Sequence, residues 1–296
     1  MASLKEVRGR IASVISTRKI TSAMRMVSAV KLRRAQDAIA GYLPYEQKLT
    51  SILDDFIAFS EADLSIPLAQ KRLVKRVAIV VISSNGSLCG AFNSNVIRKT
   101  EELLVKYKYS EIAAKNILFY PIGKKIAEAV VKKGFIPQGN FNTLLDKPNY
   151  ETVAALADEL MGLYLSKQID AVELIYNHFK NAAVQQITIE QVLPLQPGNI
   201  KSKEISVLSD YIIEPDNEWL IKKLVPKVVR LKLFGALLDS VTAEHGARTT
   251  AMQTATDNAE DMIQELKLKY NKARQEAITK EIIDIVGGAE SLRSKS

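Results

Sequence analysis

Hydrophobic residues spaced three and four positions apart mark the first part of the chain. This spacing is typical of coiled-coil helices and predicts one long helix over residues 3–58. Pro44 lies inside the pattern and should kink or locally disrupt that helix, because proline removes a backbone hydrogen bond. The apolar seam lapses in the middle, where the seam positions are Arg18, Thr21, Arg25 and Ser28.

The last part of the chain repeats the same spacing over residues 217–287. Pro226 can occupy an early turn of this second helix, and Gly287-Gly288 is expected to end it. A helix of about 70 residues is about 105 Å long, which is too long to be buried in a compact chain of this size. The second helix must therefore project. Its intervening seam positions are small, hydroxylated or histidine residues: Gly235, Thr242, His245, Thr249 and Thr256.

Between these helices the pattern changes to short apolar runs that alternate with amphipathic ones. This alternation predicts an α/β domain over residues 74–195, with a mainly parallel, twisted sheet and helices on its faces. Residues 194–216 are rich in Pro, Gly, Ser and Asp and are expected to form a linker. Strands are expected at residues 77–82, 117–122, 172–176 and 184–192, and helices at 92–107, 124–133 and 149–166.

Composition excludes several classes of protein. Hydrophobic residues make up 47% of the 296 residues and charged ones 25%, which are values of a globular protein. A single cysteine, Cys89, cannot close a disulfide within the chain, and only two histidines, His178 and His245, are present. A zinc site is therefore not expected. No apolar run approaches the roughly 20 residues that cross a bilayer, and no secretory signal is expected at the N-terminus.

The net charge of +8 is concentrated at the N-terminus. Residues 1–34 hold nine basic residues and one acidic residue, so the rest of the chain is neutral overall. At 100° per residue, Lys5, Arg10 and Arg18 point to about 140°, 280° and 0°, so the bases surround the helix. A duplex-binding helix normally gathers its bases on one face. The pattern favours a helix enclosed by a protein partner, and a basic coiled-coil nucleic-acid-binding protein is the alternative.

The turn after the first strand, residues 83–93, is the one candidate for nucleotide chemistry. It lies where phosphate-binding loops occur, between a strand and a helix. It has no Lys-Ser/Thr pair after Gly90 and does not match the dinucleotide glycine pattern. A structural turn with a buried Cys89 is the preferred interpretation. A small α/β enzyme with helical arms, using Gly86–Gly90 as its site, remains a third possibility.

Three motifs in the same order resemble the gamma subunit of F-type ATP synthase, over essentially the whole chain. The first is the N-terminal stretch of residues 10–32. The second is Leu88-Cys89-Gly90-Ala91-Phe92-Asn93. The third and most specific extends from Arg248 through Asn271-Lys272-Ala273-Arg274-Gln275-Glu276-Ala277 to Gly287-Gly288-Ala289.

The resemblance implies a bacterial rotor protein. Its fold would be a long antiparallel coiled coil of residues 1–58 and 217–287, the two shaft helices, with a central Rossmann-like α/β domain. The coiled coil would enter a hexamer of alpha and beta subunits, and the α/β domain would lie near the membrane with the epsilon subunit and the c-ring. Proton flow would turn the shaft, and ATP would form at alpha–beta interfaces. The chain itself would be non-catalytic, without cofactor, metal or nucleic acid, at the cytoplasmic face of the inner membrane as a peripheral protein held only by the complex.

The resemblance also implies contact residues. Met24, Arg248, Gln275 and Thr279 match positions where the shaft meets the beta subunits. Arg25, Arg33 and Arg34 are candidate contacts for an acidic lever segment of beta. Tyr211 and Glu214 lie in a segment that resembles the foot near the c-ring and epsilon.

Overall fold

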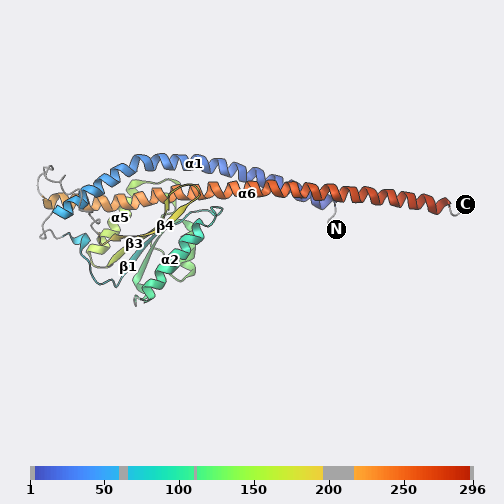
Figure 1. Ribbon diagram of the computed structural model, residues 1–296. Coiled ribbons are helices and arrows are strands. Elements are labelled where there is room, and N and C mark those ends of the chain that lie inside the picture. The colour runs from blue at the N-terminus through green and yellow to red at the C-terminus, as the bar shows by residue number, and fades with distance from the viewer. Residues whose placement is uncertain (1–3, 60–65, 110–111, 196–216, 294–296) are drawn as a thin grey trace. The chain divides into compact units, whose positions relative to one another are not determined.

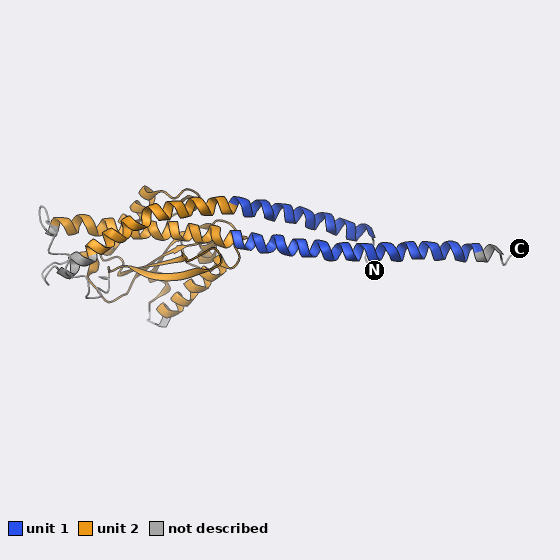
Figure 2. Ribbon diagram, turned by 45° about the horizontal axis from the view of Figure 1, so that its top comes forward, with its two compact units in different colours: residues 1–27, 249–296 blue, residues 28–248 orange. Residues whose placement is uncertain are grey.

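A computed structural model of the chain describes residues 4–59, 66–109, 112–195 and 217–293. The chain divides into two compact units (Figure 2). Unit 1 consists of residues 1–27 and 249–296, and unit 2 of residues 28–248. Each unit is described by itself.

Two long helices, α1 (Leu4–Phe59) and α6 (Asn217–Arg293), form the ends of the described chain (Figure 1). Helix α1 continues through Pro44, and α6 continues through Pro226. The expected stop at Gly287-Gly288 is wrong, because α6 continues to Arg293. Glycine costs a helix only about 1 kcal/mol relative to alanine, which weakens a helix without ending it.

In unit 1, α1 and α6 pair in antiparallel directions through a seam with polar layers. The hydroxyl oxygens of Thr21 and Thr256 lie 2.9 Å apart, and Arg18 forms an ion pair with Glu260. Small hydroxylated side chains let the two helix backbones approach closely, and their hydrogen bonds satisfy polar groups that would otherwise be buried alone. The apolar seam residues of this unit that are buried are Val7, Met252, Ala259 and Ile263.

The C-terminal part of α6 lacks this cover. Unit 1 contains only residues 4–27 of α1, against residues 249–293 of α6. Beyond residue 273 the described side chains of α6 are exposed, with the exception of the half-buried Ala277. Large apolar side chains are among them: Ile278, Ile282, Ile283, Ile285 and Val286.

Unit 2 contains a four-stranded sheet in the order β2-β1-β3-β4. Strands β1 (Val77–Ile82), β2 (Ile117–Ile122) and β3 (Ala171–Phe179) are parallel, and β4 (Gln185–Leu193) is antiparallel to β3. The β1 and β2 residues pair from Val77 opposite Ile117 to Ile82 opposite Ile122.

Alternate residues of β1 point into two separate hydrophobic cores. Val77, Ile79 and Val81 pack beneath α2 (Phe92–Tyr109) and α3 (Lys124–Lys132). Ala78, Val80 and Ile82 pack on the other face with α5 (Tyr150–Leu165) and the first half of α6. All six β1 residues are buried, as expected for a central parallel strand that is covered on both faces.

In unit 2, helix α1 contacts α6 through the side chain of Tyr42. The Tyr42 hydroxyl donates a hydrogen bond to the Leu231 carbonyl, and its ring packs edge-on against Phe234 with 5.3 Å between the ring centroids. A Cβ at Gly235 would lie 3.1 Å from the Tyr42 ring. Any larger residue at this position would push the Tyr42 ring away by a few tenths of an ångström, so glycine suits this close approach.

The expected α/β fold with long N- and C-terminal helices is confirmed. The strand positions agree within a few residues, and the short helix α4 (Thr143–Asp146) was not predicted. A one-turn helix carries too few residues for a periodic pattern.

The stability of unit 2 should depend on α5. Leu160 is 1% exposed and Leu165 is 52% exposed on the same helix. We expect Leu160→Ala to lower the free energy of unfolding by about 2–5 kcal/mol, because it leaves a cavity, and Leu165→Ala to change it by about 0.5 kcal/mol or less. Urea unfolding followed by circular dichroism measures both. Equal effects would contradict the assigned packing of α5.

Candidate functional site

The turn after β1 lies at the position where α/β proteins commonly bind ligands. The parallel strands β1, β2 and β3 end at the same edge, and β1 lies between the other two. The connection after β1 leads to β2 on one side, and the connection after β2 leads past β1 to β3 on its other side. The strand order therefore reverses beside β1, and ligands bind in the crevice at such a switch point. The geometry of this turn decides whether a crevice exists.

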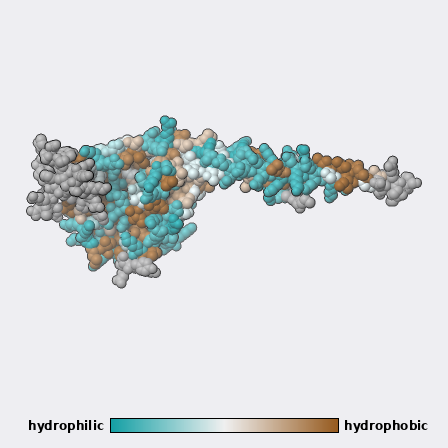
Figure 3. All heavy atoms as spheres, in the orientation of Figure 1, coloured by the Kyte–Doolittle hydropathy of each residue, from teal (hydrophilic) through white to brown (hydrophobic). Residues whose placement is uncertain are grey.

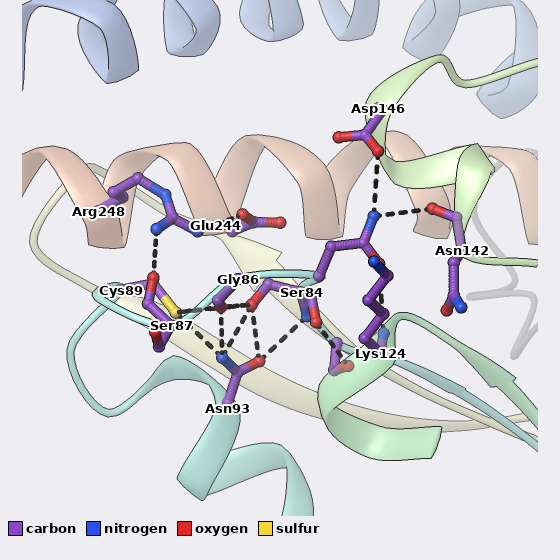
Figure 4. A network of polar contacts seen from close by, with 12 residues as sticks. Ser84, Gly86, Ser87, Cys89, Asn93, Lys124, Asn142, Asp146, Glu244 and Arg248 are labelled. Carbon is purple, nitrogen blue, oxygen red and sulfur yellow. Dashed lines mark hydrogen bonds and ion pairs between the residues drawn. The ribbon is translucent and has the colours of Figure 1, made fainter. Parts of the chain in front are cut away.

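The turn is held together by its own hydrogen bonds (Figure 4). The Ser84 backbone N–H donates to Asn93 Oδ1 at 3.0 Å, and Asn93 Nδ2 donates to the Gly86 carbonyl at 3.2 Å and lies 3.2 Å from Cys89 Sγ. Ser84 and Cys89 are buried. Asn93 belongs to the first turn of α2 and links the turn to that helix. The preferred interpretation, a structural turn with a buried Cys89, is confirmed.

Helix α6 covers this turn through a buried charged pair (Figure 4). Arg248 donates to the Ser87 carbonyl and lies 2.6 Å from Glu244, with side-chain exposures of 15% and 10%. The guanidinium also lies beside Gly86, where a Cβ would be in ordinary van der Waals contact at 3.6 Å from Arg248 Nη2. A guanidinium donates in several directions at once, so one arginine can bind both the turn and its own helix.

Apolar packing fills the remainder of the crevice. Cys89 and Phe92 form a small core with Ala243 and Ala247 of α6, against Phe179 at the end of β3. A Cβ at Gly246 would come within 2.9 Å of the Phe179 ring. α6 therefore occupies the space in which a nucleotide would bind, and the third possibility, an enzyme that uses Gly86–Gly90, is not supported.

Burial shifts the pKa values of two neighbouring residues on α6. Burial raises the pKa of Glu244, and the neighbouring Arg248 opposes this shift. Burial also lowers the pKa of His245 to about 4, and the positive charges of Lys31 and Arg248 add to the effect. His245 is therefore neutral at pH 7. His178 is half-exposed and lies with Nδ1 2.5 Å from Asp239 Oδ2.

The predicted contact residues lie in three different environments. Arg33 and Arg34 are exposed on α1 in unit 2, whereas Arg248 points inward in the same unit. Gln275 and Thr279 are one turn apart on the exposed part of α6 in unit 1, and line a shallow hollow with Ile283.

Met24 and Arg25 are half-buried in unit 1, where Arg25 donates to the Gln253 side chain. Gln253 donates in turn to Asp257 at 2.7 Å. Tyr211 and Glu214 lie outside the described residues. Sequence reasoning missed Glu244, although its spacing of four residues from Arg248 on a helix was an available signal.

Among the described residues, no three or more His, Cys, Asp or Glu side chains are grouped to hold a metal ion. None of the helices in the described ranges is long and apolar enough to cross a membrane.

Comparison with known sequences covers nearly the whole chain. The family described as ATP synthase matches residues 3–292. The ATP synthase gamma chain of Bacteroides fragilis is 54% identical over 293 residues, covering 98% of this chain and 99% of the relative. That of Flavobacterium johnsoniae is 48% identical over 292 residues, covering 99% of each.

Solved structures show the same fold at low sequence identity. A chain of the Euglena gracilis mitochondrial ATP synthase, solved with OSCP, F1 and c-ring, has a TM-score of 0.68 and 17% identity over 98% of this chain and 95% of its own. A chain of the Tetrahymena thermophila ATP synthase central stalk and c-ring has a TM-score of 0.58 and 21% identity over 80% and 99%. The sequence relationship and the shared fold agree, and the chain belongs to the family of ATP synthase gamma chains.

Proposed function

We propose that this chain is the central rotor shaft of a bacterial F-type ATP synthase. The family relationship carries the proposal, since bacterial relatives named ATP synthase gamma chain are about half identical over nearly the full length. The shaft couples proton flow through the membrane ring to ATP synthesis and hydrolysis at the alpha–beta interfaces, and it regulates ATPase activity. It is a non-catalytic subunit. The nucleic-acid alternative is not supported by the comparisons.

Exposed apolar side chains support a surrounding partner. Figure 3 shows hydrophobic residues gathered near the end of α6, where the described side chains have no cover. Helix α1 likewise exposes a set of large apolar side chains, namely Ile20, Met26, Val27 and Val30. Contiguous apolar surface of this kind marks a protein interface. Alpha and beta subunits would cover these residues.

The contact residues then have specific roles. Gln275 and Thr279 meet beta subunits from the exposed part of α6, with Met24 and Arg25 beside the helix seam. Arg25, Arg33 and Arg34 meet an acidic lever of beta, and Arg248, which also contacts Glu244 and Ser87 within the chain, meets beta from the shaft. Tyr211 and Glu214 belong to the foot at the c-ring and epsilon. The membrane association is peripheral, at the cytoplasmic face, through the complex only.

The charges that surround α1 suit a rotating shaft. A rotating shaft must exchange each contact for an equivalent one, so a deep anchor to one beta subunit would hinder each step. Charges spread around α1 provide many weak contacts instead, and exposed ion pairs contribute only about 0–1 kcal/mol each.

Co-purification tests the proposal directly. The full chain, expressed with alpha and beta subunits of its own species, should form a stable complex whose ATP hydrolysis rotates the chain, as observed with a bead attached to the foot. Ile282 is 55% exposed. We expect Ile282→Asp to weaken association at least about tenfold, because a carboxylate would be transferred into an apolar contact. Lys280→Gln on the same helix should leave association within about twofold. A chain that does not associate with alpha and beta would overturn the proposal.

Single charges on α1 should be dispensable. Arg33→Gln or Arg34→Gln alone should leave ATP synthesis in membrane vesicles within about twofold of the unaltered complex, because each contact is weak and exposed. The double variant should lower synthesis further. Loss of coupled ATP synthesis in either single variant would show that this arginine makes a strong, specific contact, and would contradict the prediction.

Arg248 should have a structural and a coupling effect that can be separated. Arg248→Gln should lower the free energy of unfolding by about 1–3 kcal/mol, because Glu244 then lacks its charged partner in a buried place. Adding Glu244→Gln should restore part of that stability, since no buried carboxylate remains. Thermal unfolding and ATP-driven proton pumping are measured on the same variants. We expect proton pumping to stay low in the double variant even though its stability is partly restored. If pumping recovered together with stability, Arg248 would have only a structural role.

A further inference from the structure

A cavity of about 550 Å³ lies in unit 2, away from the turn after β1. Its walls come from α1, from strands β3 and β4, and from the middle of α6. Cavities that bind small molecules commonly measure about 300–1,000 Å³. The rotor function described above makes no use of this cavity.

The walls of the cavity are largely apolar and aromatic. Helix α1 contributes Ile39 and Leu43, and strand β3 contributes Tyr176 and Phe179. Gly235 of α6 leaves space above its backbone, which the Tyr42 ring partly fills. A flat apolar body could therefore lie between the helix and the sheet.

Two of the three carboxylates in the lining already have partners within the chain. Glu190 forms an ion pair with Lys232 at 2.8 Å. Asp239 lies 2.5 Å from His178 Nδ1 and accepts the Phe179 backbone N–H at 2.8 Å. The carboxylates of Glu190 and Asp239 are therefore already engaged and have little room to pair with a charged ligand.

Glu46 is the third carboxylate, and its charge is not balanced locally. It follows Tyr42 by one turn on α1 and is half-buried in the lining. Among the described residues it has neither an ion pair nor a hydrogen bond. Burial raises its pKa, Glu190 raises it further, and Lys232 acts in the opposite direction with a smaller effect. A half-buried carboxylate without a cation is costly, and a bound positive charge would relieve that cost.

We propose that the cavity binds a small organic cation, in which an amine or amidinium group pairs with Glu46 and an apolar or aromatic body lies against Leu43 and Phe179. The charge of the lining favours a cation, because the lining contains three carboxylates but only one lysine and one histidine. An anion would meet Glu46 and Glu190 together and would be repelled. The inference stands independently of the rotor function, because it needs unit 2 alone.

Three probes of the same shape test the proposal on the full-length chain. Benzamidine carries the cation, benzamide is its neutral counterpart, and benzoate is the anion. We expect benzamidine to bind at millimolar concentration, at least tenfold more tightly than benzamide, and benzoate not to bind. Isothermal titration calorimetry gives the affinities, and saturation-transfer NMR shows which ligand protons contact the protein.

A pair of variants locates the site. Glu46→Gln keeps the shape and removes the charge, and should weaken benzamidine at least tenfold without changing the binding of benzamide. Asp37→Asn, at an exposed position of α1 that does not line the cavity, should leave both affinities within twofold. The thermal unfolding temperature checks that each variant is folded. Equal binding of benzamidine and benzamide by the unaltered chain, or full benzamidine binding by Glu46→Gln, would overturn the proposal.

Discussion

The packing of α6 against the sheet is the interaction on which unit 2 depends. The helix contributes Val225, Val228, Val229 and Leu233 to the larger core and then continues over the carboxyl edge of the parallel strands. In other α/β proteins that edge binds a ligand. Here the edge is covered by residues of α6, namely Ala243, Ala247 and Arg248. The helix packs where other α/β proteins bind a ligand. The tight contact at Gly246, where a Cβ would come within 2.9 Å of the Phe179 ring, shows how closely the helix and the sheet approach.

Where the same helix meets α1 in unit 1, polar pairs alternate with the buried apolar residues Met252, Ala259 and Ile263. Thr21 faces Thr256, Arg18 pairs with Glu260, and Arg25 donates to Gln253. A polar seam stabilises a helix pair less than a leucine seam, but it specifies which residues face one another. A rotor shaft needs that fixed register under torque.

Exposed apolar surface and exposed charge are distributed differently along the two long helices. The basic residues gather in the first 34 positions, whereas the exposed isoleucines gather near the end of α6. A partner at α1 would meet basic side chains together with exposed apolar ones such as Ile20 and Val30, whereas a partner at the end of α6 would meet a group of exposed isoleucines. The Glu46 cavity belongs to neither surface, which is why a small ligand there is a separate question.

The sequence by itself determined the strands, the helices and the family. Val77–Ile82 and Ile117–Ile122 were predicted at their observed bounds, because buried parallel strands form continuous apolar runs that end at polar turns. The end of α6 was predicted wrongly at Gly287-Gly288, because a helix end depends on more than the propensity of two residues. Tyr211 and Glu214 remain predictions.

Only the tertiary structure decided which way Arg248 points, that α6 fills the crevice at Gly86, and that Glu46 lines a cavity without a cation. These facts depend on which elements meet in space. A sequence read one helix at a time cannot supply them, because periodicity shows which face of a helix is buried but not what lies against it.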